Sequence, residues 1–367
     1  MATAEKTQGF RCPGCSANME FDPASGGLRC RFCGHTEVVP PSTQKVEAHP
    51  LAEGLAEAAA KANSLGAGTL EVTCDGCGSV VAFQPPEVAG KCPFCGSAIV
   101  AQAKAADPLI APDAVLPAKI PQVQAQTAVR QWLAARWFAP NALKKMAQQE
   151  GIAGVYVPFW DWAADTQTRY TGERGEHYWE TEYYTETDNN GNSVQRSRQV
   201  ERTRWYPASG QVARSFQNVL IPATKSVNEQ RLEALEPWDL ESLCGYEPAY
   251  LAGFRSQRYQ VELPEGLEKA KQEMAEVIAQ DVRKDIGGDE QRIEGMDTQT
   301  SNVTFRHLLL PVWIGAYRFS GKLYQVVVNA RTGEVQGERP WSVVKVSLLV
   351  VAILLVIILL VAIGGRH

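Results

Sequence analysis

The sequence predicts two small modules held together by cysteine clusters, an α+β domain with an antiparallel sheet, and one C-terminal transmembrane helix. Three observations carry this prediction. Cysteine pairs recur near the N-terminus, apolar residues over 119–340 follow both helical and strand periods, and the last stretch of the chain is long, apolar and uncharged. A chain of 367 residues is long enough for two or three domains.

The composition argues against some partners and favours a reducing environment. A formal net charge of −5 and a pI near 5.7 give no overall attraction to nucleic acid or anionic lipid. The first residues lack the basic and apolar segments of a signal peptide. Eight of the nine cysteines lie in Cys-x-x-Cys pairs, which in a reducing compartment indicate metal binding rather than disulfides. We therefore expect the body of the protein to be cytosolic.

The cysteine pairs form an internal repeat with an offset of 62 residues. In each copy, fourteen residues separate two Cys-x-x-Cys pairs, and the second pair contains a phenylalanine, Phe32 or Phe94. A spacing shared by two copies makes chance an implausible origin. The predicted metal ligands are Cys12, Cys15, Cys30 and Cys33 in the first copy and Cys74, Cys77, Cys92 and Cys95 in the second.

Four thiolates in this pattern are typical of a zinc ribbon with rubredoxin-like knuckles. Each Cys-x-x-Cys turn directs two sulfurs at one ion, and two turns complete the tetrahedral S₄ site that suits Zn²⁺. Such a closed site leaves no position for water, so we expect a structural metal. Iron can bind the same thiolates, although the short spacing fits a zinc ribbon better. We expect two Zn²⁺ ions, one per cluster, each supplying folding free energy on the order of 10 kcal/mol to a module too small for its own core.

Changes in composition divide the chain into segments. The predicted ribbons cover 1–40 and 69–100, and Ala- and Pro-rich linkers cover 41–68, with a short helix, and 101–118. The predicted α+β domain covers 119–340 and the transmembrane helix 343–363.

Three segments of the large domain have clear periods. Pro264 to Ile286 places apolar residues on one stripe between an initial proline and a glycine pair, which predicts an amphipathic helix. Gly154 to Trp160 is rich in β-branched and aromatic residues and predicts a strand. His307 to Val335 predicts a β-meander.

A polar insert at 176–206 predicts a long hairpin. Asn190-Gly191 is a strong turn signal between two alternating stretches, the first rich in glutamate and the second in arginine. A loop centred there would place Glu186 opposite Arg196 and Glu180 opposite Arg202, and such pairs contribute roughly 0.2–1 kcal/mol each. Two interpretations stay open: a merely solvated hairpin, and a docking arm that projects from the domain.

The C-terminal stretch predicts a membrane anchor. Val346 to Ile363 runs 18 residues without a charge, roughly 27 Å of helix at about 1.5 Å per residue. It also lacks the polar stripe of a core helix in a soluble protein. Its place near the end of the chain, without a signal peptide, predicts a tail-anchored, single-pass protein of the cytoplasmic membrane with its N-terminal body in the cytosol.

No pattern predicts catalysis. Cys244, which lies outside the pairs, is typical of a small buried side chain, and the five histidines have neither ligand nor triad spacing. The pair Gly287-Gly288 lacks the Lys-Ser/Thr of a phosphate-binding loop. We expect no enzyme, no catalytic residue and no cofactor-binding residue apart from the metal ligands.

The charge of the ribbons distinguishes two kinds of partner. The first ribbon balances its basic and acidic residues, and the second has Lys91 against three acidic residues, so neither offers many cations to phosphate. This balance favours contact with protein. The alternative, a membrane-tethered nucleic-acid-binding zinc-ribbon protein, requires folding to assemble a basic face.

The ribbons, the runs GVYVPFWDW and LLLPVW…YQVVVNARTGEV, and the hydrophobic tail together resemble a family of bacterial membrane proteins with paired zinc ribbons. Its members are often labelled zinc-ribbon or primosomal-helicase-like proteins, although this sequence has no Walker-type loop. Some relatives occur beside phage-shock and SPFH-type proteins, so the resemblance implies a partner of that kind. We expect a membrane-anchored cytosolic adaptor that recruits protein partners to the membrane, in envelope stress or membrane organisation.

Overall fold

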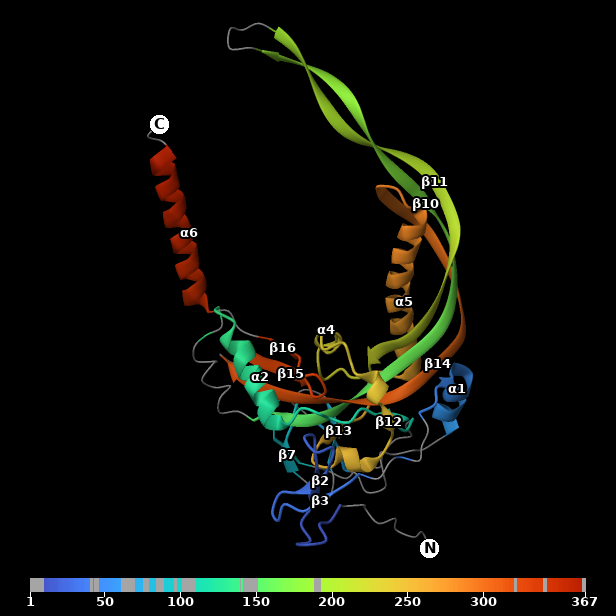
Figure 1. Ribbon diagram of the computed structural model, residues 1–367, viewed down its shortest axis with the longest axis vertical. Coiled ribbons are helices and arrows are strands. Elements are labelled where there is room, and N and C mark those ends of the chain that lie inside the picture. Colours follow the sequence, from blue (N-terminus) through green and yellow to red (C-terminus); the bar gives the residue numbers. More distant parts are fainter. Residues whose placement is uncertain are drawn as a thin grey trace.

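The computed structural model describes residues 10–364 except for 40–41, 43–45, 61–69, 75–78, 84–88, 96–97, 101–109, 139, 141–150, 188–192, 320–321 and 339–341. Over these residues the chain is mostly antiparallel β-sheet with few helices (Figure 1). The predicted α+β class is therefore wrong. Three long strands, Ala153–Thr187, Ser193–Pro222 and Glu290–Phe319, make up most of the region for which an α+β domain was expected. Each strand extends far beyond the apolar stretch that the sequence shows.

The elements follow one another in this order. The first module contains β1 (Met19–Asp22), β2 (Gly27–Cys30) and β3 (Thr36–Glu37), followed by β4 (His49–Pro50) and α1 (Leu51–Ala60). The second contains β5 (Leu70–Thr73), β6 (Val80–Phe83), β7 (Ala89–Lys91) and β8 (Ala98–Val100). The body contains β9 (Ala114–Val115), α2 (Gln122–Ala134), β10 (Ala153–Thr187), β11 (Ser193–Pro222), α4 (Glu229–Glu233), β12 (Cys244–Gly245), β13 (Arg255–Gln257), α5 (Leu263–Ile286), β14 (Glu290–Phe319), β15 (Lys322–Asn329), β16 (Val335–Gly337) and α6 (Val343–Gly364), with 3₁₀ turns at Leu240–Ser242 and Pro248–Leu251.

Strand β10 lies at the centre of the main sheet. It pairs antiparallel with β11 from Phe159 to Thr187 and with β14 from Ala153 to Gly175. The three strands curve together, as Figure 1 shows, while β15 and β16 extend the sheet beside the end of β14. Because neighbouring side chains of a strand point to opposite faces, β10 contributes to a separate apolar core on each side of the sheet.

Helix α5 covers the concave side of the curved strands (Figure 1) and confirms the predicted amphipathic helix. A proline stands in its first turn, and Gly287, with φ of 66°, ends it in a conformation that glycine adopts at little cost. Its position depends on a close approach, since a Cβ at Gly266 would lie 2.7 Å from the Trp160 ring. The indole N–H of Trp160 in turn donates to the Val261 carbonyl at 2.8 Å.

The predicted hairpin is present, but its register differs from the expected one by two residues. Glu186 pairs with Val194 and Glu180 with Val200, so the expected ion pairs form diagonally across the ladder. The nearest nitrogen and oxygen atoms are 2.9 Å apart for Arg196 and Glu186. The Asn190-Gly191 turn lies outside the described residues.

Over the part of the chain that the structure describes, no helix is long and apolar enough to cross a membrane. The predicted transmembrane helix, the tail anchor and the location at the cytoplasmic membrane are therefore wrong. The first turn of α6 contacts the body, because Lys345 Nζ donates a hydrogen bond to the Trp137 carbonyl at 2.9 Å.

The contact between α5 and α4 predicts a pH-dependent stability. Burial, and then the charges of Glu233, Glu236 and other glutamates, raise the pKa of Glu273 to about 7. An unfolded chain loses this proton near its ordinary value of 4.5, so the folded state should lose stability as the pH rises from about 4.5 to 7. We expect Glu273→Gln to raise the free energy of unfolding at pH 8 by about 1 kcal/mol, after discounting for solvent screening.

Thermal unfolding of the wild type and the variant at pH 8 and pH 5 measures this effect. The difference between the two proteins should shrink at pH 5, where Glu273 is protonated in the folded state. Glu268→Gln, on the exposed side of α5, is the matched control. An equal stabilisation at both pH values would contradict the assignment.

Candidate metal centres

The first cysteine cluster is built by two tight turns beside the small sheet of β1, β2 and β3. In each turn an amide closes onto the carbonyl of the first cysteine: Ser16 N–H donates to Cys12 at 2.8 Å, and Gly34 N–H donates to Cys30 at 3.0 Å. Ser16 and Gly34 both have positive φ, 60° and 77°. The repeated sequence motif therefore folds into a repeated backbone turn.

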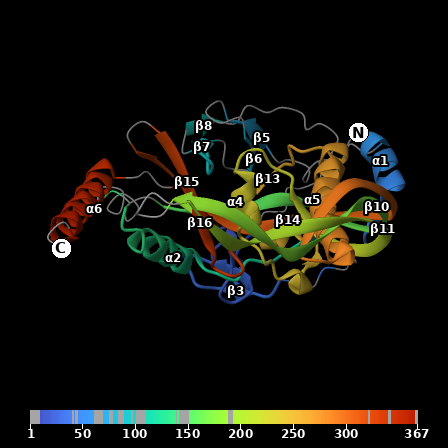
Figure 2. The same ribbon diagram turned by 90° about the horizontal axis from the view of Figure 1, so that it is seen from above.

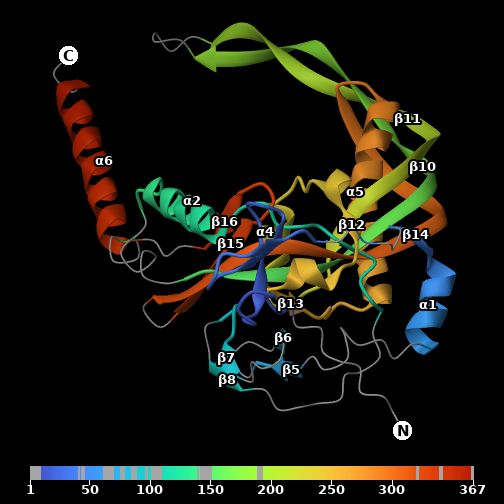
Figure 3. The ribbon, with the colours of Figure 1, turned by 60° about the horizontal axis from the view of Figure 1, so that its bottom comes forward.

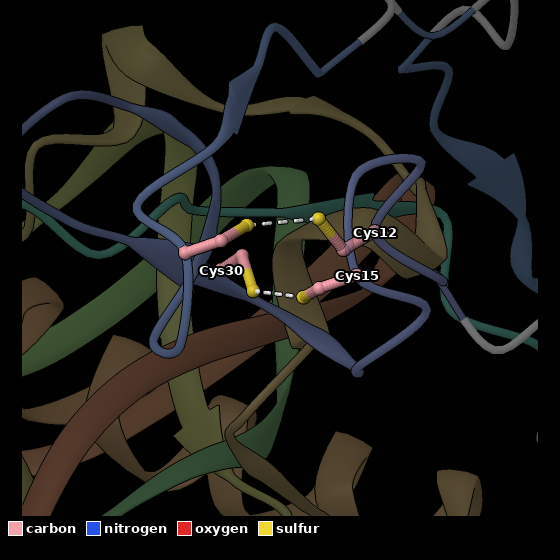
Figure 4. A group of neighbouring side chains, drawn as sticks. Cys12, Cys15 and Cys30 are labelled. Atoms are coloured by element: carbon pink, nitrogen blue, oxygen red, sulfur yellow. Dashed lines mark hydrogen bonds between the residues drawn. The ribbon is translucent and has the colours of Figure 1, made fainter.

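The four sulfurs of this cluster all lie within 4.8 Å of one another. Cys12 Sγ is 3.3 Å from Cys33 Sγ, and Cys15 Sγ is 3.5 Å from Cys30 Sγ. Figure 4 shows Cys12, Cys15 and Cys30 converging on a common point. A tetrahedral site with Zn–S bonds of about 2.3 Å holds its sulfurs about 3.8 Å apart. The donor set therefore fits a zinc ion after small movements of the side chains.

The surroundings of the thiols favour a bound cation. The backbone amides of Cys33 and Phe32 lower the pKa of the Cys30 thiol to about 6. At Cys15 the amide of Ala17 acts in the same direction, but hydrogen bonds with neighbouring thiols and burial raise the pKa to about 12. Without a metal, four thiolates this close together would repel one another, whereas a divalent cation allows all of them to ionise.

The second cluster brings Cys74, Cys92 and Cys95 within 4.8 Å of one another, and all three are buried. Cys74 Sγ is 3.5 Å from Cys95 Sγ, and Ser79 Oγ is 3.4 Å from Cys92 Sγ. Cys77 lies outside the described residues. Three of the four predicted ligands are therefore brought together, and Cys77 as the fourth ligand stays a prediction from the repeat.

The two modules pack on opposite faces of the main sheet. The first shares a core with Tyr156 of β10 and Leu309 of β14. The second shares a core with Val155 and Val157 of β10 and with Leu310 of β14. Figure 2 shows β3 on one side of the long strands and β7 and β8 on the other. Adjacent residues of the same two strands thus cover different cysteine clusters.

The equivalent phenylalanines of the two Cys-x-x-Cys turns differ in burial, which the sequence did not predict. Phe94 is fully buried, and its carbonyl accepts a hydrogen bond from Gln325 Nε2 of β15 at 2.5 Å. Phe32 is 83% exposed, and Val38 on the same module is equally exposed. The first module instead packs through Phe21, whose ring meets Tyr250 edge-on and whose amide donates to the Ala252 carbonyl. The repeat marks the two positions as equivalent, and nothing in the sequence indicated that one would be buried and the other exposed.

The other reactive side chains lie apart from the clusters. Cys244 is half-buried, and burial raises the pKa of its thiol. His307 is buried beside Trp160, and burial lowers its pKa, while Asp113 accepts hydrogen bonds from the His307 amide and from His49. Asp113 thus links His49 of β4 to His307 of β14.

Fold and clusters together define a protein with two zinc-ribbon-like cysteine sites mounted on an antiparallel β-sheet. No family model matches the chain, and no solved structure matches it. Among curated proteins, the chain is similar to the uncharacterized protein YdjG of Bacillus subtilis (strain 168), with 26% identity over 342 residues that cover 92% of each chain. The similarity therefore extends over nearly the whole of both proteins.

Metal analysis should find close to two zinc ions per purified chain. Cys30→Ser should remove one of them, because it breaks the first S₄ set, and Cys92→Ser should remove the other. Cys244→Ser, outside both clusters, should leave the zinc content unchanged. Elemental analysis of protein prepared without added metal or chelator measures all four. Iron in place of zinc, or no metal, would contradict the assignment.

Proposed function

We propose that the protein is an adaptor that binds another protein through its first zinc ribbon. The observation that carries this proposal is the contrast between Phe32 and Phe94. The two side chains occupy the same position of a repeated motif, and one is buried by the body of the chain while the other is 83% exposed.

The buried knuckle provides an example of how such a ribbon docks. Phe94 lies in an apolar core with Val155 and Val157 of β10 and Val327 of β15. Gln325 supplies a hydrogen bond to the knuckle backbone next to this core. An apolar pocket beside one polar donor is the usual composition of a binding site for a single anchoring side chain.

The exposed knuckle offers the same features to a partner. Burying a phenylalanine side chain contributes about 1.5–3 kcal/mol, and Val38 on the same module adds apolar surface. A zinc-stapled turn is rigid, so binding would cost little conformational entropy. We infer that Phe32 is the anchoring side chain.

The charges near this knuckle favour a protein over nucleic acid. Arg31 pairs with Glu20, and Arg29 lies 3.9 Å from Asp22 at the nearest charged atoms. Each arginine is thus partly neutralised within the module, which leaves little positive charge for phosphate. The partner implied by the family resemblance is an SPFH-type or phage-shock-type protein, and we propose such a protein as the first to test.

The function is tested with a photo-reactive amino acid at position 32 in living cells, followed by binding measurements with the purified partner. Phe32→Ser should weaken binding by at least about tenfold, the effect of losing about 1.4 kcal/mol. Phe32→Leu should retain most of the affinity, since it keeps an apolar anchor.

Val123→Ser is the matched control, because Val123 is also an exposed apolar residue, 73% exposed, but lies on α2. It should bind like the wild type. Equal affinities of the wild type and Phe32→Ser, with two zinc ions retained in both, would refute the proposal.

A further inference from the structure

The hairpin ends in a two-stranded arm, formed by Glu176–Thr187 of β10 and Ser193–Arg204 of β11. Strand β14 accompanies β10 only as far as Gly175. Beyond that point, among the residues that the structure describes, β10 pairs with β11 alone, and the arm extends away from the body (Figures 1 and 3). Two-stranded ribbons are marginally stable in water, so an arm of this length gains from a third strand.

The open edge of β10 in the arm is the same side of the strand that pairs with β14 as far as Gly175. The His177 amide donates to the Asp289 carboxylate at 2.7 Å, and Asp289 N–H donates to the Gly175 carbonyl. Because bonding direction alternates along a strand, every second residue after His177 directs its amide and carbonyl to the same open side. The structure thus identifies a row of outward-bonding residues: Trp179, Thr181, Tyr183, Thr185 and Thr187.

This edge has only part of the usual protection against strand addition, because the charged residues of β10 alternate with the outward-bonding ones. Natural edge strands carry charges, prolines or bulges that block pairing. The outward-bonding row of β10 is instead uncharged and consists of residues that favour strands. By contrast, β11 carries Pro207 near the base of the arm, where the ladder pairs it with Glu173. The two edges of the arm therefore differ in their readiness to accept a strand.

The two faces of the arm specify what the added strand would contain. One face, here called the aromatic face, displays Trp179 and Tyr183, which are 65% and 68% exposed. The other, here called the charged face, has a row of glutamates on β10 next to a row of arginines on β11. Three arginines form ion pairs within the arm, Arg196 with Glu186, Arg198 with Glu182 and Arg202 with Glu180.

The charged side chains nearest the open edge are therefore glutamates, and Glu180, Glu182 and Glu186 each pair with an arginine of β11. On the charged face, a strand added to β10 would lie directly beside the glutamates, with the arginines one strand further away. Cross-strand pairs of opposite charge stabilise a sheet, and like charges directly opposite destabilise it. Pairing two β10 edges from two copies of the chain would set glutamate against glutamate, so a second copy is disfavoured.

We propose that the β10 edge of the arm binds an extended segment of a partner polypeptide as a third, antiparallel strand. The segment alternates basic residues, which face the glutamates, with β-branched or aromatic residues, which pack on Trp179 and Tyr183. Backbone hydrogen bonds supply affinity, and the alternation supplies specificity. This site is separate from the first zinc ribbon and acts independently of Phe32.

A designed peptide that alternates lysine and valine is the probe, and binding to the full chain is measured by fluorescence anisotropy. The peptide should bind saturably, and a matched peptide with glutamate in place of lysine should bind at least about tenfold more weakly. Glu180→Gln combined with Glu182→Gln should weaken binding of the lysine peptide and leave the glutamate peptide no weaker. Equal binding of the two peptides to the wild type, or no binding of either, would overturn the proposal.

A second pair of variants tests the backbone edge without changing charge. Thr181→Pro removes one outward-pointing amide that forms no hydrogen bond within the hairpin. The arm should therefore still fold, and binding of the lysine peptide should be lost. Thr181→Val keeps the amide and should bind normally. Circular dichroism and thermal unfolding verify that both variants fold like the wild type.

Peptide binding unchanged by Thr181→Pro would overturn the assignment of the edge. Sedimentation of the wild-type protein without peptide addresses the rival occupant. If the wild type self-associates and Thr181→Pro abolishes this association, the occupant of the β10 edge is a second copy of the chain, and the proposal of a partner segment is overturned.

Discussion

The pairing of β10 with β14 on one side and β11 on the other is the constraint on which the rest of the structure depends. Successive side chains of β10 pack into two different cores, with Tyr156 facing the first cysteine module and Val155 and Val157 facing the second. Further along, the same strand carries Trp160 into the core beneath α5. A shift of one residue in the pairing would exchange these sets, so the register determines where both cysteine clusters lie.

The sequence was informative where a local rule governs the structure. Helix α5 follows from its apolar stripe, its initial proline and Gly287, and the cysteine turns follow from their spacing. The ion pair of Arg196 with Glu186 was also predicted from the sequence, but the register of the two strands that places the pair diagonally was not. These features depend on residues close together in the chain, or on one repeated distance.

The features that the sequence did not reveal depend on tertiary contacts. The alternation of Glu176 to Thr187 resembles that of any solvated hairpin, so nothing local indicated that β10 continues unbroken from Ala153. Which face of the sheet each module covers depends on pairings such as Ser256 with Ala82, far apart in the chain. The expectation of a membrane helix rested on hydropathy over Val346 to Ile363, and it is contradicted by the described part of α6.

The two clusters also differ in how their ligands meet solvent. In the first, Cys15 and Cys33 are exposed, whereas Cys74, Cys92 and Cys95 are all buried. An ion that binds only the folded state is thermodynamically linked to the folding of whatever encloses it. An ion held by Cys74, Cys92 and Cys95 would lie against the buried core around Phe94, whereas an ion in the first cluster would lie beside the exposed Cys15 and Cys33. One chain would thus hold a slowly exchanging ion as part of its architecture and a rapidly exchanging one that follows the metal supply around it.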